Sequence, residues 1–203
     1  TPPRGMSSAA SDVYKRQIFT PAYDCYQPAV ELAGGKPVFV QLKAPDYSVN
    51  WEEVKKLISQ KTKMIIINTP HNPTGTILSR DDMLELEKIT SESEIIILSD
   101  EVYEHIIFDQ IEHESICRYK GLAARSMAVF SFGKTFHVTG WKMGYCIGPK
   151  ELMKEFRKVH QFNVFSSNHP LQHALADYLR DRESSIFPSG VFIKKKERYF
   201  NKQ

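Results

Sequence analysis

The stretch KMIIIN, residues 63–68, decides the fold class of this chain. Three consecutive isoleucines between polar ends indicate a strand that is buried on both faces, as in parallel sheets covered by helices. Two further runs have the same character, EIIILSD at 94–100 and SMAVFSF at 126–132. The sequence therefore predicts an α/β fold built on a mostly parallel sheet.

Amphipathic helices and shorter strands fill the intervals between these runs. WEEVKKLIS, residues 51–59, is a predicted helix with Asn50 as its N-cap, and DDMLELEKIT, residues 81–90, is one with Ser79 as its N-cap. Repeated strand–helix–strand units imply right-handed crossovers, with helices on both faces of the sheet. The other predicted elements are strands at 37–42 and 144–148 and helices at 151–162 and 171–181.

Composition limits the classes of function that fit the chain. The 203 residues suit one domain with a sizeable core, and 41% apolar with 25% charged residues is ordinary for a globular protein. The net charge of +3 is too small to indicate a nucleic-acid partner, and the basic run KKKER at 194–198 is typical of a solvated helix face. The apolar runs are far shorter than the ~20 residues that cross a bilayer, so no membrane association is expected.

Cysteine usage points to a reducing compartment. Cys25, Cys117 and Cys146 are odd in number and show no Cys-x-x-Cys spacing, so neither a disulfide framework nor a metal site is expected. A cytoplasmic location fits this pattern best. Residues 1–17, TPPRGMSSAASDVYKRQ, are small, polar and aperiodic, and we interpret them as a leader that is disordered or foreign to the rest of the chain.

Chemically capable side chains follow three of the predicted strands. Asn72 lies in the turn after 63–68, Asp100 and Tyr103 follow the second apolar run, and Ser131 and Lys134 follow the third. Because the carboxyl ends of parallel strands open onto one edge of the sheet, these groups are expected to meet there. Each has a plain structural alternative, such as a helix cap for Asp100, a turn former for Asn72 or a surface charge for Lys134.

Lys134 allows several chemical interpretations. Ser131 and Lys134 satisfy the Ser-x-x-Lys pattern of serine acyl-enzymes, but the Ser-Asp-Asn and Lys-Thr-Gly elements of that chemistry do not occur. A phosphate loop ending in GKT, residues 133–135, would need glycine where Ala128 stands. A desolvated lysine amine can instead form a Schiff base with a carbonyl compound.

A Schiff-base lysine with these neighbours fits the needs of pyridoxal phosphate. That cofactor requires a lysine, a carboxylate for the ring nitrogen, donors for the ring oxygen, hydroxyls and cations for the phosphate, and an aromatic side chain to stack on the ring. The candidates for these five roles are, in the same order, Lys134; Asp100; Tyr103 with Asn72; Ser131 with Lys142; and Tyr23.

The segments NTPHNPTG (68–75), SDEVYEH (99–105) and SFGKTFHVTGWKMGY (131–145) together resemble the fold type I aminotransferases of classes I and II. Within them the chain is most similar to the branch that contains kynurenine and bacterial methionine aminotransferases. The resemblance runs from about Ile18 to the C-terminus. It implies the three-layer large domain of pyridoxal-phosphate-dependent transferases over residues 18–203, incomplete and with the small domain largely missing.

The resemblance also assigns roles to individual residues. Lys134 matches the Schiff-base lysine, Asp100 the partner of the ring nitrogen, and Tyr103 with Asn72 the contacts to the ring oxygen. Lys142 stands where many aminotransferases have a phosphate-binding arginine, and the kynurenine and methionine branch shares this lysine. The other matches are Ser131 to a phosphate hydroxyl, Tyr23 to the stacking aromatic, and Phe165 to a loop aromatic that lines the neighbouring subunit's substrate pocket.

The implied activity is transfer of an amino group between an L-amino acid of the methionine, aromatic or kynurenine type and a 2-oxo acid, in a cytoplasmic homodimer. Lys134 would be displaced from the cofactor by the amino acid and would then act as general base on its α proton. A carbon–sulfur lyase on the same fold would share every residue named here. Since family members are roughly twice this length, a third possibility is an incomplete chain that is inactive in isolation.

Overall fold

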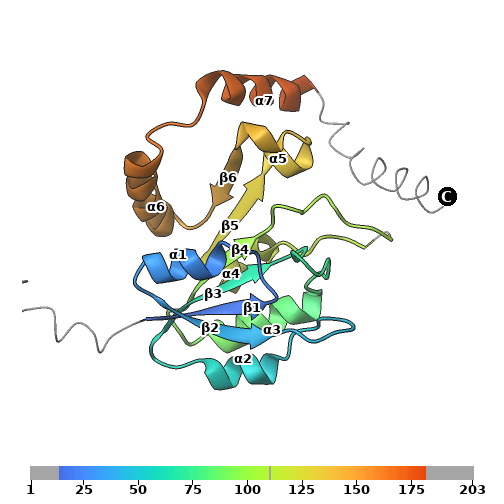
Figure 1. The fold of residues 1–203 in the computed structure, drawn as a ribbon, viewed down its shortest axis with the longest axis vertical. Coiled ribbons are helices and arrows are strands. Elements are labelled where there is room, and N and C mark those ends of the chain that lie inside the picture. The colour runs from blue at the N-terminus through green and yellow to red at the C-terminus, as the bar shows by residue number, and fades with distance from the viewer. Residues whose placement is uncertain (1–13, 110, 182–203) are drawn as a thin grey trace, which may run out of the picture.

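The computed structural model of the chain describes residues 14–109 and 111–181 (Figure 1). Residues 1–13 of the predicted leader and the basic run at 194–198 lie outside the described residues. A six-stranded sheet in the order β2-β1-β3-β4-β5-β6 forms the centre of the described part. Its strands are β1 (Lys15–Thr20), β2 (Lys36–Gln41), β3 (Thr62–Asn68), β4 (Ile96–Asp100), β5 (Ser126–Ser131) and β6 (Gly144–Ile147).

Helices lie on both faces of the sheet and beyond its β6 edge (Figure 1). Asn50 caps the helix that follows β2, since its side chain accepts a hydrogen bond from the Glu53 N–H. Ser79 and Asp82 form a reciprocal capping box at the start of the helix that follows β3. The helices are α1 (Tyr26–Leu32), α2 (Trp51–Leu57), α3 (Arg80–Thr90), α4 (Lys120–Ala123), α5 (Phe132–Thr135), α6 (Lys150–Asn163) and α7 (His169–Asp181), with 3-10 turns η2 (Ile116–Arg118) and η3 (Thr139–Trp141).

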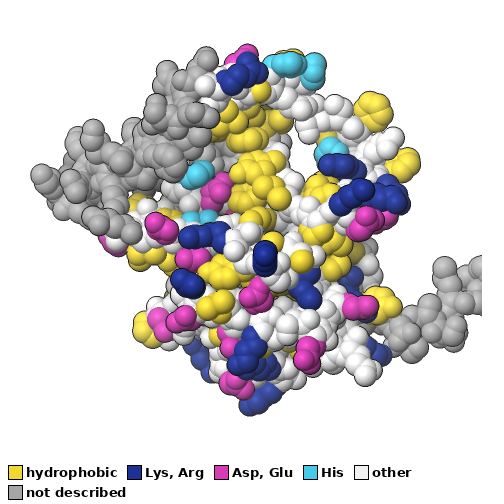
Figure 2. Space-filling view, turned by 180° about the vertical axis from the view of Figure 1, so that it is seen from behind, with side chains coloured by type: hydrophobic (Ala, Val, Ile, Leu, Met, Phe, Trp, Pro, Cys, Tyr) yellow, Lys and Arg dark blue, Asp and Glu magenta, His cyan; other side chains and the backbone are white. Residues whose placement is uncertain are grey.

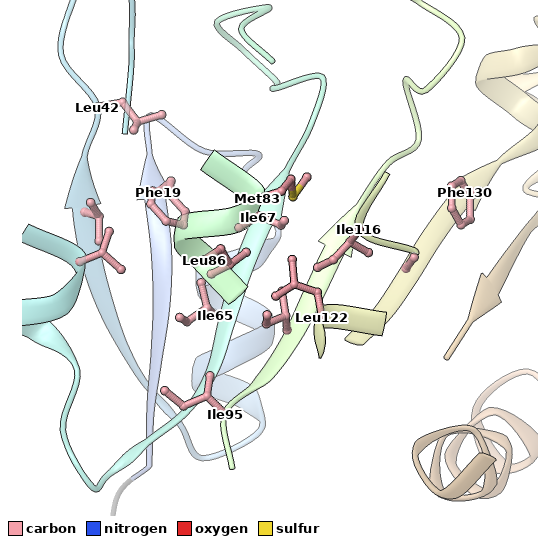
Figure 3. Close-up of a cluster of buried hydrophobic side chains, with 14 residues drawn as sticks. Phe19, Leu42, Ile65, Ile67, Met83, Leu86, Ile95, Ile116, Leu122 and Phe130 are labelled. Carbon is pink, nitrogen blue, oxygen red and sulfur yellow. The ribbon is translucent and has the colours of Figure 1, made fainter. Parts of the chain in front are cut away.

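The isoleucine run of β3 supplies side chains to two cores, because successive residues of a strand point to opposite faces. Ile65 and Ile67 belong to the larger core, which contains residues from α2, α3 and α4 (Figure 3). Ile66 belongs to the smaller core, with Ile18 from β1 and Tyr26 from α1. The prediction of a strand buried on both faces is therefore confirmed.

The sheet is parallel except at one edge. Strands β1 to β5 pair in parallel, whereas β5 and β6 pair antiparallel with Ser131 opposite Gly144. Only α5 and η3 lie between β5 and β6, so no crossover helix carries the chain back to the other end of the sheet. A Cβ at Gly144 would collide with the Phe130 carbonyl oxygen, which requires glycine at this close approach.

The first strand starts earlier than the sequence indicates. We expected the leader to extend to residue 17, but Lys15, Arg16 and Gln17 pair with Lys36, Pro37 and Val38 of β2. The side chain of Gln17 is fully buried, and its Nε2 donates to the Val54 carbonyl oxygen at 3.2 Å. Backbone pairing holds these polar residues in the sheet, which an apolar pattern does not reveal.

The C-terminal helices of the described part are more exposed than the rest. The predicted helices at 151–162 and 171–181 are present as α6 and α7, and α6 has no buried residue. Phe162 is 89% exposed and Val159 is 68% exposed. Figure 2 shows hydrophobic side chains at the surface below α7. No helix in residues 14–109 and 111–181 is long and apolar enough to cross a membrane.

Candidate active site

Three predicted site residues meet at the carboxyl edge of the sheet. Asp100 is the last residue of β4, Tyr103 lies in the turn that follows, and Lys134 lies on α5 directly after β5. The Lys134 Nζ atom lies 5.2 Å from the centroid of the Tyr103 ring. Burial raises the pKa of the Asp100 carboxyl group, and the nearby charge of Lys134 opposes part of this rise. The expected convergence of these three groups is thus present in the structure.

The Asp100 carboxyl group is largely enclosed and receives two hydrogen bonds. Its Oδ2 accepts from the Tyr26 hydroxyl at 2.5 Å and its Oδ1 from the Val102 N–H at 3.3 Å. Burial nevertheless raises the pKa of Asp100 above its ordinary value, because these donors and Lys134 only partly offset the loss of solvation. A cation placed against this carboxyl group would stabilise its ionised form.

Tyr26 is a site residue that the sequence analysis missed. It lies at the first position of α1 and is 9% exposed, and its ring packs edge to face on that of Tyr23 with 5.7 Å between centroids. Burial and the neighbouring Asp100 raise the pKa of its hydroxyl, which keeps the phenol protonated as a donor. The sequence feature that could have identified Tyr26 is the second tyrosine of YDCY, residues 23–26. It was not used because helix α1, which Tyr26 opens, was not predicted.

Asn72 is held in a compact turn after β3. The Thr69–Pro70 and Asn72–Pro73 peptide bonds in this turn are cis. The Asn72 N–H donates to the Asn68 Oδ1 at 2.7 Å, and the Asn68 Nδ2 donates to the Asp100 carbonyl oxygen at 2.9 Å. Asn72 and Asp100 are therefore connected through one side chain.

The short helix α5 holds Lys134 near the Tyr103 ring. The Thr135 hydroxyl donates to the Ser131 carbonyl oxygen at 3.1 Å, and the Thr139 hydroxyl donates to that of Gly133 at 3.3 Å. A Cβ at Gly133 would lie 3.0 Å from the Thr139 Cα, so glycine permits the close approach of η3. These bonds fix the helical turn that carries the lysine.

A series of aromatic contacts joins α5 to its surroundings. Phe130 of β5 stacks on Tyr145 of β6 with 4.7 Å between centroids, and Phe132 lies 5.1 Å from Tyr145. Phe136 continues the series, 6.0 Å from Phe132 and 5.1 Å from Tyr178 of α7. Such pairs add to the energy of area burial, so the lysine-bearing turn is anchored on both sides.

The four remaining predicted residues surround this centre less closely. Ser131 is the last residue of β5, and Tyr23, which precedes α1, is 46% exposed. Lys142 follows η3 in a left-handed conformation with φ of 54° and an exposed side chain. Phe165 follows α6 and is 82% exposed, and within the described residues no hydrogen bond or ring contact joins it to the residues around Asp100. Its role across a dimer stays a prediction.

A cavity of about 680 Å³ adjoins the site. Asn68, Asn72 and Tyr103 form one wall, and apolar residues that include Leu78 and Phe108 form the other. Neither Lys134 nor Asp100 lines it. The Lys134 amine and the Asp100 carboxyl group therefore lie outside this cavity.

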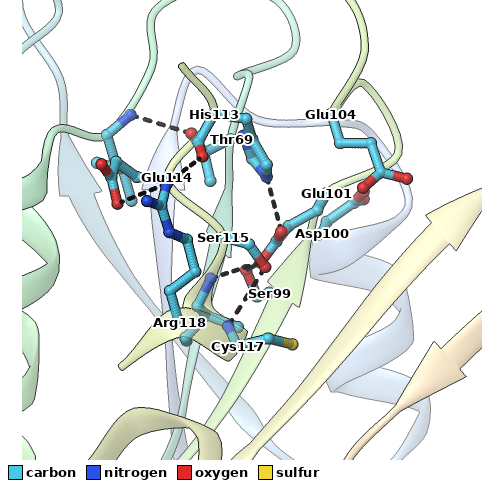
Figure 4. A network of polar contacts seen from close by, with 12 residues as sticks. Thr69, Ser99, Asp100, Glu101, Glu104, His113, Glu114, Ser115, Cys117 and Arg118 are labelled. Carbon is cyan, nitrogen blue, oxygen red and sulfur yellow. Dashed lines mark hydrogen bonds and ion pairs between the residues drawn. The ribbon is translucent and has the colours of Figure 1, made fainter. Parts of the chain in front are cut away.

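A buried carboxylate stabilises the end of β4 next to Asp100. The side chain of Glu101 is fully buried and its Oε1 accepts from the Ser99 hydroxyl at 2.8 Å and from the Ile116 N–H at 3.0 Å (Figure 4). Its Oε2 lies 2.7 Å from the His113 Nε2. These contacts tie β4 to the segment before η2. In the part of the chain that the structure describes, no group of three His, Cys, Asp or Glu could hold a metal ion.

A lysine amine, a half-buried acid and a phenol thus lie together at the carboxyl edge of a mostly parallel sheet, as expected of a fold type I transferase domain. The sequence model of the family "Aminotransferase class I and II" matches residues 15–200. The chain belongs to the class I and II aminotransferase family.

Individual relatives agree with this assignment. The chain is 48% identical over 178 residues to a methionine aminotransferase of Escherichia coli (strain K12), which covers 88% of this chain and 46% of that protein. It is 36% identical over 189 residues to the human kynurenine–oxoglutarate transaminase 1, covering 87% of this chain and 44% of that protein. The chain thus spans about half the length of these relatives.

A solved structure shows the same fold. An Escherichia coli protein described as having a methionine aminotransferase function superposes with a TM-score of 0.90 at 42% identity. The match covers 92% of this chain and 50% of that one. The fold class that we expected from the sequence is confirmed, with the chain corresponding to about half of such a protein.

Proposed function

We propose that the chain carries the cofactor-binding centre of a pyridoxal-phosphate-dependent aminotransferase. Its substrates would be an L-amino acid of the methionine, aromatic or kynurenine type and a 2-oxo acid. The observation that carries the proposal is the meeting of the Lys134 amine, the half-buried Asp100 carboxyl group and the Tyr103 phenol at one edge of the sheet. The names of the relatives support the substrate class.

The residues present fit the cofactor chemically. Asp100 is a half-buried acid whose pKa is raised by loss of solvation, and a pyridinium nitrogen would supply the cation that favours its charged form. Tyr103 and Asn72 would donate to the ring oxygen, Ser131 and Lys142 would hold the phosphate, and Tyr23 would stack on the ring. When bound, the cofactor supplies an aldehyde for covalent attachment and a sink for the electrons released at the substrate's α carbon.

The chain's own residues perform the proton chemistry. Lys134 would hold the cofactor covalently through its Nζ, and its free amine would serve as the general base for the α proton. Asp100 would be held in its ionised form by the ring nitrogen's positive charge, with the Tyr26 hydroxyl and the Val102 N–H donating to its two oxygens. Both groups lie on short segments that directly follow strands, so the sheet fixes their relative position.

The family also supports a homodimer with Phe165 lining the neighbouring subunit's substrate pocket. A cytoplasmic location agrees with the odd number of cysteines that the sequence contains. These statements extend the proposal beyond the residues around Asp100, and a measurement of mass in solution tests the dimer.

Trapping of the covalent link tests the proposed function. The 203-residue chain is incubated with pyridoxal phosphate, reduced with borohydride and digested, and the labelled peptide is identified by its mass. We expect the label on Lys134, no label in Lys134→Ala, and full labelling in Lys154→Ala, which changes an exposed lysine of α6. A label that persists in Lys134→Ala contradicts the proposal. Pyruvate and ammonia from a cysteine conjugate, without amino transfer, would indicate a lyase.

A further inference from the structure

Asn68, the last residue of β3, uses both ends of its side-chain amide within the site. Its Oδ1 accepts from the Asn72 N–H at 2.7 Å, and its Nδ2 donates to the Asp100 carbonyl oxygen at 2.9 Å. We propose that Asn68 is a positioning residue that fixes Asn72 relative to Asp100. This inference rests on the proposed function, in which Asn72 would contact the ring oxygen and Asp100 the ring nitrogen of one pyridine ring.

The turn that carries Asn72 is bonded mainly to itself. The His71 N–H donates to the Thr76 carbonyl oxygen at 2.7 Å, and the Gly75 N–H donates to that of His71 at 2.8 Å. The Leu78 N–H donates to the Thr69 hydroxyl oxygen at 3.0 Å, which closes the turn at its base. A turn tied in this way is expected to reorient as a unit, so the direction of the Asn72 side chain depends on how the turn is attached to the sheet.

Asn68 forms a central part of that attachment. It pairs with Asp100 in the register of β3 and β4 and is 7% exposed. The Thr69 N–H donates to the same Asp100 carbonyl oxygen at 3.0 Å. At the end of the strand pair, a backbone donor and the Asn68 side chain therefore share one acceptor. Beyond this point the Asn68 Oδ1 is the acceptor that holds the Asn72 N–H.

The link matters because the two groups it joins would act on one rigid ring. A planar ring fixes the separation between its nitrogen and its oxygen, so a rotation of the turn would misalign the Asn72 donor while Asp100 stays in place. Catalytic groups need positions accurate to about 0.5 Å. Asn68 therefore affects the cofactor through Asn72, without touching it.

Hydrogen exchange tests the link without any cofactor. In the 203-residue chain, Asn68→Leu removes both hydrogen bonds and should speed exchange of the Asn72 N–H, whereas Asn68→Asp keeps an acceptor oxygen and should leave it protected. The matched control is Thr62→Val, which removes a buried hydroxyl at the other end of β3, where Thr62 Oγ1 accepts from the Ser59 N–H. Unchanged exchange at Asn72 in Asn68→Leu overturns the inference.

The pH dependence of the bound cofactor's visible absorbance tests the consequence. The Asn72 donor should favour the deprotonated ring oxygen, so Asn68→Leu should raise the midpoint pH by about 0.5 unit or more. Asn72→Ala should raise it in the same direction, and the double variant should add nothing further, because both changes remove one donor. Thr62→Val should leave the midpoint unchanged although it lowers stability.

The outcomes separate this inference from the proposed function. A wild-type chain that forms no adduct at Lys134 overturns both. An adduct at Lys134 whose midpoint is unaffected by Asn68→Leu overturns only the inference, as does a double variant in which the two shifts add. Faster exchange at Asn72 together with a non-additive shift supports it.

Discussion

At the scale of single residues, the hydrogen bond from Tyr26 to Asp100 makes the clearest prediction. The Tyr26 hydroxyl donates to the Asp100 Oδ2 at 2.5 Å and lowers the pKa of that carboxyl group against the opposing effect of burial. Tyr26→Phe removes the donor and keeps the ring, so we expect the pKa of Asp100 to rise further. Titration of the Asp100 side-chain carbon by NMR measures it in the chain without cofactor.

The control for this prediction is a second tyrosine nearby. Tyr23 packs on the Tyr26 ring, yet no hydrogen bond from it to Asp100 occurs among the described residues. Tyr23→Phe should therefore leave the pKa of Asp100 unchanged. An equal pKa of Asp100 in wild type and Tyr26→Phe would contradict the assignment of Tyr26.

His71 predicts a loss of stability in acid. It is 8% exposed with its Nδ1 2.7 Å from the Thr74 hydroxyl oxygen, and burial lowers its pKa below the ordinary value of 6.5. The unfolded chain therefore takes up a proton, as pH falls below about 6.5, that the folded chain binds less tightly. The free energy of unfolding should fall through this range, by at most about 1.4 kcal/mol per pH unit for one proton.

Denaturant unfolding at pH 7.5 and pH 5.5 checks this effect. His71→Asn keeps a polar atom near the Thr74 hydroxyl but no longer titrates, so its free energy of unfolding should fall less between the two conditions. Part of the fall should persist, because burial also lowers the pKa of His105. A fall of equal size in wild type and variant would show that His71 does not contribute.

At the scale of elements, the Glu101 contacts determine how firmly the end of β4 is held. Glu101→Leu leaves the Ser99 hydroxyl and the Ile116 N–H without their acceptor in a buried place, so we expect a loss of about 3 kcal/mol or more in stability. Glu101→Gln keeps one acceptor oxygen and should cost less. Glu112→Gln is the control, since the Glu112 side chain is 83% exposed and should change stability by under ~0.5 kcal/mol.

Chemical denaturation measures these three differences. A Glu101→Leu variant as stable as Glu112→Gln would mean that the Glu101 contacts drawn in Figure 4 contribute nothing to stability. Because Asp100 directly precedes Glu101, the Leu variant should also weaken cofactor labelling at Lys134 more than the Gln variant does.

Apolar runs and capping residues determine which elements the sequence predicts. Strands β3, β4 and β5 were recognised because their apolar runs lie within a core, and α2 and α3 because of their capping residues. Helix α1 was missed because it has seven residues and an N-cap, Cys25, without a capping hydrogen bond. The early start of β1 depends on pairing between backbones, which a single stretch of sequence does not encode.

Some residues of the candidate site can be predicted from the sequence, and others cannot. The rule that ligands lie at the carboxyl ends of parallel strands grouped Asn72, Asp100 and Lys134 correctly at one edge. It could not identify Tyr26 or Asn68, because their roles depend on which polar atoms meet after folding. Their distances of 2.5 and 2.7 Å become evident only in three dimensions.

At the scale of the whole molecule, the chain matches about half the length of its relatives. It corresponds to 46% of the Escherichia coli methionine aminotransferase and 44% of the human kynurenine–oxoglutarate transaminase 1. Phe162 and Phe165, at and after the end of α6, are 89% and 82% exposed. Under the proposed function, the half of these relatives that the chain does not match would supply further contacts to a substrate at Lys134 and shield its charges from water.

We therefore expect the isolated 203-residue chain to be labelled at Lys134 but to show weak or no transamination. A chimera in which residues 15–181 replace the matching half of the Escherichia coli methionine aminotransferase should recover turnover, since 48% identity preserves most packing positions. The measurement is formation of the 2-oxo acid from methionine by chain, chimera and chimera with Lys134→Ala. Robust turnover by the isolated chain would contradict the prediction, because it would show that these residues alone complete the site.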